Sequence, residues 1–196
     1  MGYHPRIESN QYASFITTRT RNEELWFVNN PTLEKDILLR MAVATERYQA
    51  KIYAVAIEGN HIQLPADFPN LNRSKFMRDF NSGVAKSVIK NVTNYHGGKL
   101  WARRYSQEFL PGDINVEDRF FYTVLQPVQD GLVDSIFKYP GYNCFDDAVS
   151  GKVLEFEHVD WKAYEAALKR NVKTSINDYI EIVKFSFTRL PGYESL

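Results

Sequence analysis

The side chains with the clearest chemical potential are a histidine and a glutamine two residues apart, His61 and Gln63. They follow the apolar run 52–57. On a β-strand this spacing places both side chains on one face, because successive side chains alternate between the two faces. An imidazole nitrogen and an amide oxygen would then converge on one point. Two readings stay open for this stretch alone, a metal site and a structural role for the pair.

The residues before His61 have the composition of a tight turn. Gly59-Asn60 should let His61 begin a strand that folds back on residues 51–57. Glu58, on the other side of the turn, is either a group that supports the ligands from behind or a surface residue of this hairpin, and we favour the surface position.

A second stretch, residues 120–133, adds a phenol and another oxygen donor. If the stretch is helical, Tyr122 and Gln126 are one turn apart on the same face. Pro127 lies inside the apparent span of the helix, so the helix should kink or end close to Gln126. A hydroxyl group and an amide oxygen would thus be presented together.

The two stretches resemble, in order and spacing, the single-tyrosine HUH transposases, which include insertion-sequence enzymes and REP-associated tyrosine transposases. The Pro-Asn-His-x-His signature of that family corresponds here to Gly-Asn-His61-Ile-Gln63. Its Tyr-x-x-x-Asn/Gln-Pro-Val-x-x-Gly-Leu-Val helix corresponds to Tyr122-Thr-Val-Leu-Gln126-Pro-Val-Gln-Asp-Gly-Leu-Val. The resemblance runs from about residue 5 to residue 142. It departs from the family at Gln63, where a second histidine is expected, and at the glycine that replaces the usual proline.

The resemblance implies that Tyr122 is a nucleophile that forms a covalent 5′-phosphotyrosine, and that His61, Gln63 and Gln126 hold a divalent ion. One imidazole and two amide oxygens make a neutral, oxygen-rich set, which favours Mg²⁺ or Mn²⁺ over zinc. The implied activity is metal-dependent cleavage and strand transfer of single-stranded or hairpin DNA. The alternative is a catalytically decayed protein that binds a DNA or RNA hairpin without cutting it. Both a monomer and a homodimer that exchanges the tyrosine helix stay open.

The net charge of zero conceals a segregated distribution of charge. Residues 71–105 hold eight basic residues and one acidic residue. Such a segment could hold a polyanion, and its aromatic rings could stack on bases. A solvated helix surface is the alternative. The expected DNA contacts are Arg73, Lys75, Arg78, Lys86, Lys90, Lys99, Trp101, Arg103, Arg104 and Tyr105.

Hydrophobic periodicity predicts the elements that must position these groups. We expect strands at 13–19, 51–57 and 61–68, and helices at 32–50, from 70 to Gly97-Gly98, and from about 115 to Gln126. The resulting fold class is α/β (α+β), an antiparallel sheet of ferredoxin-like or RRM-like topology with helices packed on one face. Residues 1–150 would form the HUH transposase-like catalytic domain. Residues 151–196 would form a small helical C-terminal extension, with helices that begin at Asp160 and Ser175, and the last residues read as a linker to further sequence.

The bulk composition is that of an ordinary globular chain, with 196 residues of which 44% are hydrophobic. No apolar run approaches the roughly 20 residues that span a bilayer, and the first residues lack the apolar segment of a secretory signal. We therefore expect a cytoplasmic protein without a membrane partner. Cys144 is the single cysteine, which excludes an internal disulfide and indicates packing.

Overall fold

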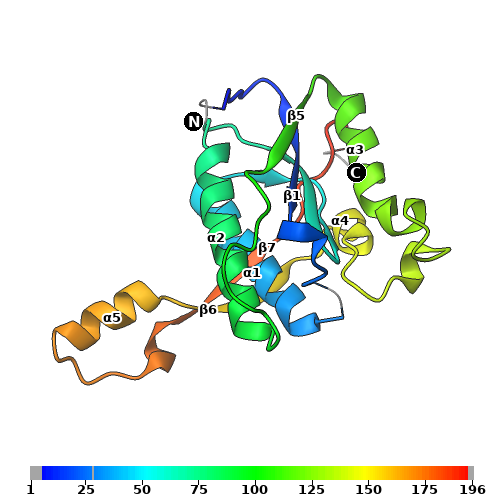
Figure 1. Cartoon of the computed structure of the whole chain (residues 1–196). Coiled ribbons are helices and arrows are strands. Elements are labelled where there is room, and N and C mark those ends of the chain that lie inside the picture. Colours follow the sequence, from blue (N-terminus) through cyan, green and yellow to red (C-terminus); the bar gives the residue numbers. More distant parts are fainter. Residues whose placement is uncertain (1–5, 28, 194–196) are drawn as a thin grey trace.

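The computed structural model describes residues 6–27 and 29–193, and its centre is an antiparallel sheet (Figure 1). The strands lie in the order β2-β4-β1-β5, and β3 also pairs with β4. Their bounds are β1 Ala13–Arg19, β2 Lys51–Ile52, β3 Ala56–Glu58, β4 His61–Asp67 and β5 Ser106–Leu110. The predicted class, an antiparallel sheet with packed helices, is confirmed.

Helices cover both faces of this sheet, so the expectation of helices on one face is wrong. Helices α1 (Pro31–Tyr48) and α2 (Arg73–Asn91) bury the face that carries Ile16, Ile62 and Leu64. Helix α3 (Asp113–Gln129) lies against β3, β4 and β5 on the opposite face, and Figure 1 shows the sheet between these two helical layers. The apolar stripe of α3 packs on the face of the sheet that α1 and α2 leave open.

The first arm of the central hairpin is split into β2 and β3 by a bulge. Ile52 pairs with Ala66 and Ala56 pairs with Gln63, so three residues of one arm face two residues of β4. Pro65 has no backbone N–H to donate to the neighbouring strand. Its carbonyl oxygen accepts a hydrogen bond from the Tyr53 N–H at 3.1 Å. The extra residue decides which residues of the first arm share a face with the side chains of β4.

The long helical pattern after residue 70 ends earlier than expected. Helix α2 stops at Asn91, and Val92 leaves the helical conformation with φ −115° and ψ 101°. Gly97-Gly98 therefore lies in the connection to β5 and does not end the helix. Helix α3, in contrast, continues through Pro127 to Gln129, which corrects the expected end near Gln126. A proline in the last turn removes only one of the helix hydrogen bonds.

The C-terminal segment contains a strand where a second helix was expected. The capping box at Ser175 and Asp178 is present, but it opens only the short 3-10 helix η3 (Ile176–Tyr179), after which β7 (Ile180–Phe185) pairs with β6 (Leu154–Val159). Helix α5 (Trp161–Lys169) connects them. Figure 1 shows this arm projecting from the body. Its base is part of the main core through Phe156, Val183, Phe185 and Phe187.

The remaining elements are short. They are η1 (Arg21–Glu23), η2 (Ile136–Lys138) and α4 (Phe145–Ser150). Cys144, before α4, is fully buried, and its sulfur accepts a hydrogen bond from the Val55 N–H, as expected for a packing residue. Among the described residues, no helix has both the length and the apolar character needed to cross a membrane.

Candidate functional site

The β3–β4 hairpin brings three polar side chains to one face of the sheet. The two-residue turn pairs Glu58 directly with His61, and Gln63 lies two residues further along β4. Their face is the one covered by α3, because Ile62 points to the opposite core. All three side chains are buried, with 4%, 4% and 3% of their surface exposed. The structure thus places His61 and Gln63 on the same face of β4, as their spacing predicts.

The buried polar atoms on this face lack hydrogen-bond partners. They are Glu58 Oε1, His61 Nε2, Gln63 Oε1 and Gln126 Oε1. Buried polar atoms are almost always paired, so four unpaired ones on one face need an explanation. With Glu58 ionised and the His61 proton on Nδ1, all four atoms are acceptors and cannot satisfy one another. A cation is a suitable partner for each of them.

The lone pair of His61 Nε2 is available because the other ring nitrogen is engaged. Nδ1 lies 2.8 Å from Asn60 Oδ1, an atom that can only accept, so the proton is on Nδ1. A carboxamide that fixes the tautomer in this way is typical of a histidine that binds a metal through its other nitrogen.

Gln126 joins the cluster from α3. Its Nε2 donates to both carboxylate oxygens of Asp130, at 3.3 and 3.2 Å, which leaves its Oε1 as the unpaired group. Asp130 in turn acts electrostatically on both Glu58 and His61. Gln126 and the two hairpin residues therefore share Asp130 as a neighbour.

The residue types of this cluster fit a hard divalent cation. Imidazole, carboxylate and amide oxygens are ligands for Mg²⁺ or Mn²⁺. Within the described ranges, no three His, Cys, Asp or Glu side chains gather as a metal site. Any ion held here depends on the amide oxygens of Gln63 and Gln126.

Burial dominates the electrostatics of the cluster. It lowers the pKa of His61 to about 4, with a smaller contribution from the Arg19 cation, so the imidazole is neutral near pH 7. Burial, followed by the Asp130 carboxylate, raises the pKa of Glu58 to about 7. Arg19 acts in the opposite direction on Glu58. The cluster without a cation thus disfavours charge on both groups.

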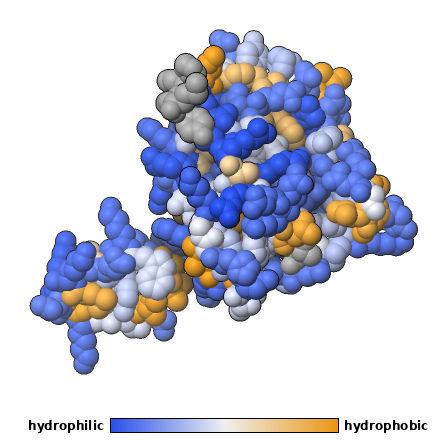
Figure 2. Space-filling view, in the orientation of Figure 1, coloured by the Kyte–Doolittle hydropathy of each residue, from blue (hydrophilic) through white to orange (hydrophobic). Residues whose placement is uncertain are grey.

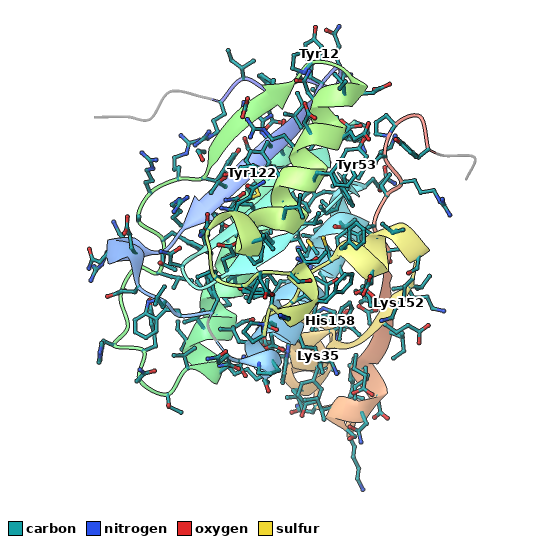
Figure 3. All side chains as sticks on the ribbon, turned by 90° about the vertical axis from the view of Figure 1, so that its right-hand side faces the viewer. Tyr12, Lys35, Tyr53, Tyr122, Lys152 and His158 are labelled. Carbon is teal, nitrogen blue, oxygen red and sulfur yellow. The ribbon has the colours of Figure 1, made fainter. Side chains whose placement is uncertain are left out.

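Tyr122 shares the face of the cluster but does not touch it. Its ring packs edge-on against Phe15 at a centroid distance of 5.8 Å, and the Arg119 guanidinium lies 5.3 Å from its centre. Figure 3 shows Tyr122 on α3, at the side of the helix that lies over the strands of the main sheet. Phe15 lies two residues along β1 from Thr17, the partner of Gln63, which is about 7 Å along the sheet. No hydrogen bond or ring contact among the described residues joins Tyr122 to His61, Gln63 or Gln126.

Two of the expected DNA contacts are buried and are corrected here. Arg73 is 1% exposed, its Nη1 donates to Ser14 Oγ at 3.0 Å and its Nη2 donates to the Ile7 carbonyl. Tyr105 is 6% exposed and lies under the Arg6 guanidinium at 4.0 Å. Both side chains therefore make internal contacts, although Nε of Arg73 has no hydrogen-bond partner.

Trp101 also has an internal role. It is half-buried, and its indole N–H donates to the Asn81 carbonyl oxygen at 2.9 Å. Its ring packs on Phe27 at 6.1 Å. These contacts hold the connection between α2 and β5 against the sheet.

The exposed cations among the expected DNA contacts fall into two groups on different sides of the molecule. Lys75, Arg78, Lys86 and Lys90 lie on α2, which covers the face opposite the His61 cluster. Lys99, Arg103 and Arg104 lie in the connection that follows. That connection runs beside the end of β1 that holds Arg19, since the Ala102 N–H donates to the Arg19 carbonyl oxygen at 3.0 Å. Figure 2 shows a largely hydrophilic surface over the body, where this connection crosses it.

Sequence reasoning missed three charged residues around the cluster. Glu58 was expected on the surface but is buried beside His61, while Arg19 and Asp130 were not considered. A signal for Glu58 existed, because the residues that flank a two-residue hairpin turn face each other on one side of the sheet. Arg19 could be placed only once the register of β1 against β4 was known.

Comparisons with known proteins agree with this architecture. The family described as "Transposase IS200 like" matches residues 9–115, a segment that contains β1 and the His61 hairpin but ends before Tyr122. A REP-associated tyrosine transposase, solved bound to a REP hairpin, has 15% sequence identity and a TM-score of 0.63 over 77% of this chain and 87% of that chain. At this identity it shows the fold alone. A putative transposase from Deinococcus radiodurans R1 has 10% identity and a TM-score of only 0.43 over 66% of this chain and 95% of that chain, too low to carry an argument.

No curated protein matches the chain. The family match nevertheless covers more than half of its residues. The matched range, residues 9–115, contains all the strands of the main sheet. On this evidence, the chain belongs to the IS200-like transposase family.

Proposed function

We propose that this transposase-family protein cleaves and rejoins single-stranded DNA, with Tyr122 as the nucleophile and with Mg²⁺ or Mn²⁺ held by His61, Gln63 and Gln126. The observation that carries the proposal is the set of buried, unpaired acceptor atoms on the face covered by the tyrosine helix. Tyr122 is one helical turn from Gln126, so one rigid element presents both the phenol and a ligand. The family membership supports a DNA substrate.

The cleavage step exchanges one phosphoester bond for another. The Tyr122 oxygen loses its proton and attacks the phosphorus, and the bond from phosphorus to the 3′-oxygen breaks. The products are a 5′-phosphotyrosine and a 3′-hydroxyl group, which takes up a proton. Because the new ester keeps the energy of the old one, a second 3′-hydroxyl group can reverse the step and rejoin strands. A bound divalent ion would polarise the phosphate and offset its charge.

The protein groups around the cluster would orient the substrate. Tyr122 has no hydrogen bond to any described residue, so its hydroxyl is free to meet a phosphate. Arg19 is exposed at the edge of the cluster, and the connection that holds Lys99 and Arg103 runs beside it. These cations would bind the phosphates that flank the scissile bond. The exposed cations on α2 lie on the opposite face, so they would contact DNA only if the DNA wraps around the molecule.

Hairpin DNA is the substrate that we propose to test first, since the REP-associated relative was solved bound to a hairpin. The protein is incubated with a labelled single-stranded hairpin and Mn²⁺, and covalent adducts are separated under denaturing conditions. The wild type should form an adduct that Tyr122→Phe does not form. Tyr12→Phe is the matched control, because Tyr12 is an exposed tyrosine near the same sheet and should leave the adduct unchanged.

The competing function is recognition of a hairpin without cleavage. Gln63 in place of the family's second histidine is the feature that favours it. Hairpin binding without any adduct, at saturating Mn²⁺, would decide for the binding protein. Comparison of DNA and RNA hairpins of one sequence at fixed salt would then identify the ligand.

A further inference from the structure

Glu58 is a buried carboxylate without a role in the proposed ligand set. It is 4% exposed, and its Oε1 has no hydrogen-bond partner. Its Oε2 lies 3.7 Å from Nε2 of His61, which is too long for a hydrogen bond. Because Nδ1 of this ring holds the proton, Nε2 offers only a lone pair, so the two atoms face each other as acceptors.

A second carboxylate, that of Asp130, lies near Glu58 and acts on it electrostatically. Asp130 also accepts the Gln126 amide, at 3.3 and 3.2 Å. A cation beside two neighbouring carboxylates offsets the repulsion between them. A cation would also give the unpaired Oε1 of Glu58 a partner.

We infer that Glu58 is a fourth ligand of the divalent ion, and this inference rests on the proposed metal site. His61, Gln63 and Gln126 bring no negative charge, whereas Mg²⁺ and Mn²⁺ sites usually contain at least one carboxylate. Glu58 supplies that charge beside the very nitrogen that binds the metal. Ligand atoms that each lie about 2.0–2.6 Å from one ion are roughly 3–4.5 Å apart, a range that includes the observed 3.7 Å.

The carboxylate also accounts for the departure at Gln63. Replacing a histidine by a glutamine leaves a weaker neutral donor, and a buried acidic residue three positions before His61 offsets that loss. The cluster therefore keeps enough donor strength in spite of the changed signature. Arg19 is a cation that acts on both Glu58 and His61, but it is exposed and can turn toward a DNA phosphate.

The test measures metal binding without DNA. Mn²⁺ is titrated into the full chain, and free Mn²⁺ is followed by electron paramagnetic resonance. Glu58→Gln, which keeps the shape but removes the charge, should weaken Mn²⁺ binding at least about tenfold. Glu181→Gln is the matched control, because Glu181 also faces a histidine, His158, across an antiparallel strand pair, and it should bind like the wild type.

A second measurement guards against misfolding. Thermal unfolding of Glu58→Gln in a chelator should occur at no lower temperature than in the wild type, and Mn²⁺ should raise its melting temperature less than it raises that of the wild type. Equal Mn²⁺ affinity of Glu58→Gln and wild type overturns the inference, as does a wild type that binds no Mn²⁺. If Mn²⁺ binding depends on Glu58 but no DNA adduct forms, the ligand assignment stands and the proposed cleavage fails.

Discussion

Among the residues that the structure describes, two cross-strand pairs combine a histidine with a glutamate, and their surroundings differ. Glu58 faces His61 in the hairpin of the main sheet, and Glu181 faces His158 in the projecting arm. The first pair is buried beneath α3, with two glutamine side chains on the same face. In the second pair Glu181 is exposed and His158 is half-exposed, and Figure 3 shows His158 far from Tyr122.

The difference shows that a pair of ligand types does not make a site. Water satisfies the polar atoms of an exposed pair, so that pair needs no further partner. Burial removes the water and leaves acceptors that only a donor or a cation can satisfy. Substitutions at the buried pair should therefore change activity and stability, whereas those at the exposed pair should not.

Removal of each imidazole should separate the pairs most strongly. His61→Ala should abolish adduct formation on hairpin DNA and leave hairpin binding nearly intact, because the role proposed for the ring is to hold the ion and not the DNA. His158→Ala should leave both unchanged. Adduct assays and binding titrations at one salt concentration measure the two properties. An equal loss of binding and cleavage in His61→Ala would mean that the ring is structural.

The apolar residues beside the two pairs should differ in their contribution to stability. Leu64 is completely buried on the far side of β4, so Leu64→Ala should lower the free energy of unfolding by about 2–5 kcal/mol. Ile182, next to Glu181, is 54% exposed, and Ile182→Ala should change the free energy of unfolding by less than about 0.5 kcal/mol. Denaturant unfolding of the metal-free proteins gives both values. Similar losses would show that the arm packs against another surface in solution.

The amide oxygen of Gln63 has no hydrogen-bond partner, so it should destabilise the folded protein when no metal is present. Gln63→Leu removes a buried acceptor without a partner, so it should raise the metal-free free energy of unfolding by about 1–3 kcal/mol. The same variant should bind Mn²⁺ more weakly. Unfolding in a chelator and Mn²⁺ titration provide the two measurements. A destabilised Gln63→Leu would mean that the amide makes a stabilising contact and is not held for a ligand.

The pH dependence of the metal-free protein should contain two opposing contributions from the buried pair. The pKa of His61 falls from 6.5 to about 4 on folding, so its contribution to stability is full above pH 6.5 and is lost as pH falls toward 4. The pKa of Glu58 rises from 4.5 to about 7, so its contribution is full below pH 4.5 and is lost as pH rises toward 7.

The pH dependence of stability of single variants, measured in a chelator, should show each contribution separately. Glu58→Gln should become more stable as pH rises from 4 to 6.5, and His61→Gln should become less stable as pH rises from 4.5 to 7. Glu181→Gln should follow the wild type. Slopes of the same sign in the two buried-pair variants would contradict the assignment of these groups.

The local arrangement of the candidate site was predictable from residue spacing. Alternation along a strand put His61 and Gln63 on one face, and helical spacing put Tyr122 one turn from Gln126. The bounds of β1 were also predictable, because a run of β-branched and aromatic residues favours a strand in most contexts. Each of these features depends on neighbours within a few residues.

Features that depend on distant partners were not predictable from residue spacing. Residues 180–185 form a strand because β6, more than twenty positions earlier, offers backbone groups to pair with, although their apolar spacing also suits a helix. Arg73 is buried because Ser14 and Ile7 meet its guanidinium, and Glu58 is buried because α3 crosses the hairpin. Local spacing fixes which side chains share a face, whereas burial, and with it the chemistry of these charged groups, depends on which remote element covers that face.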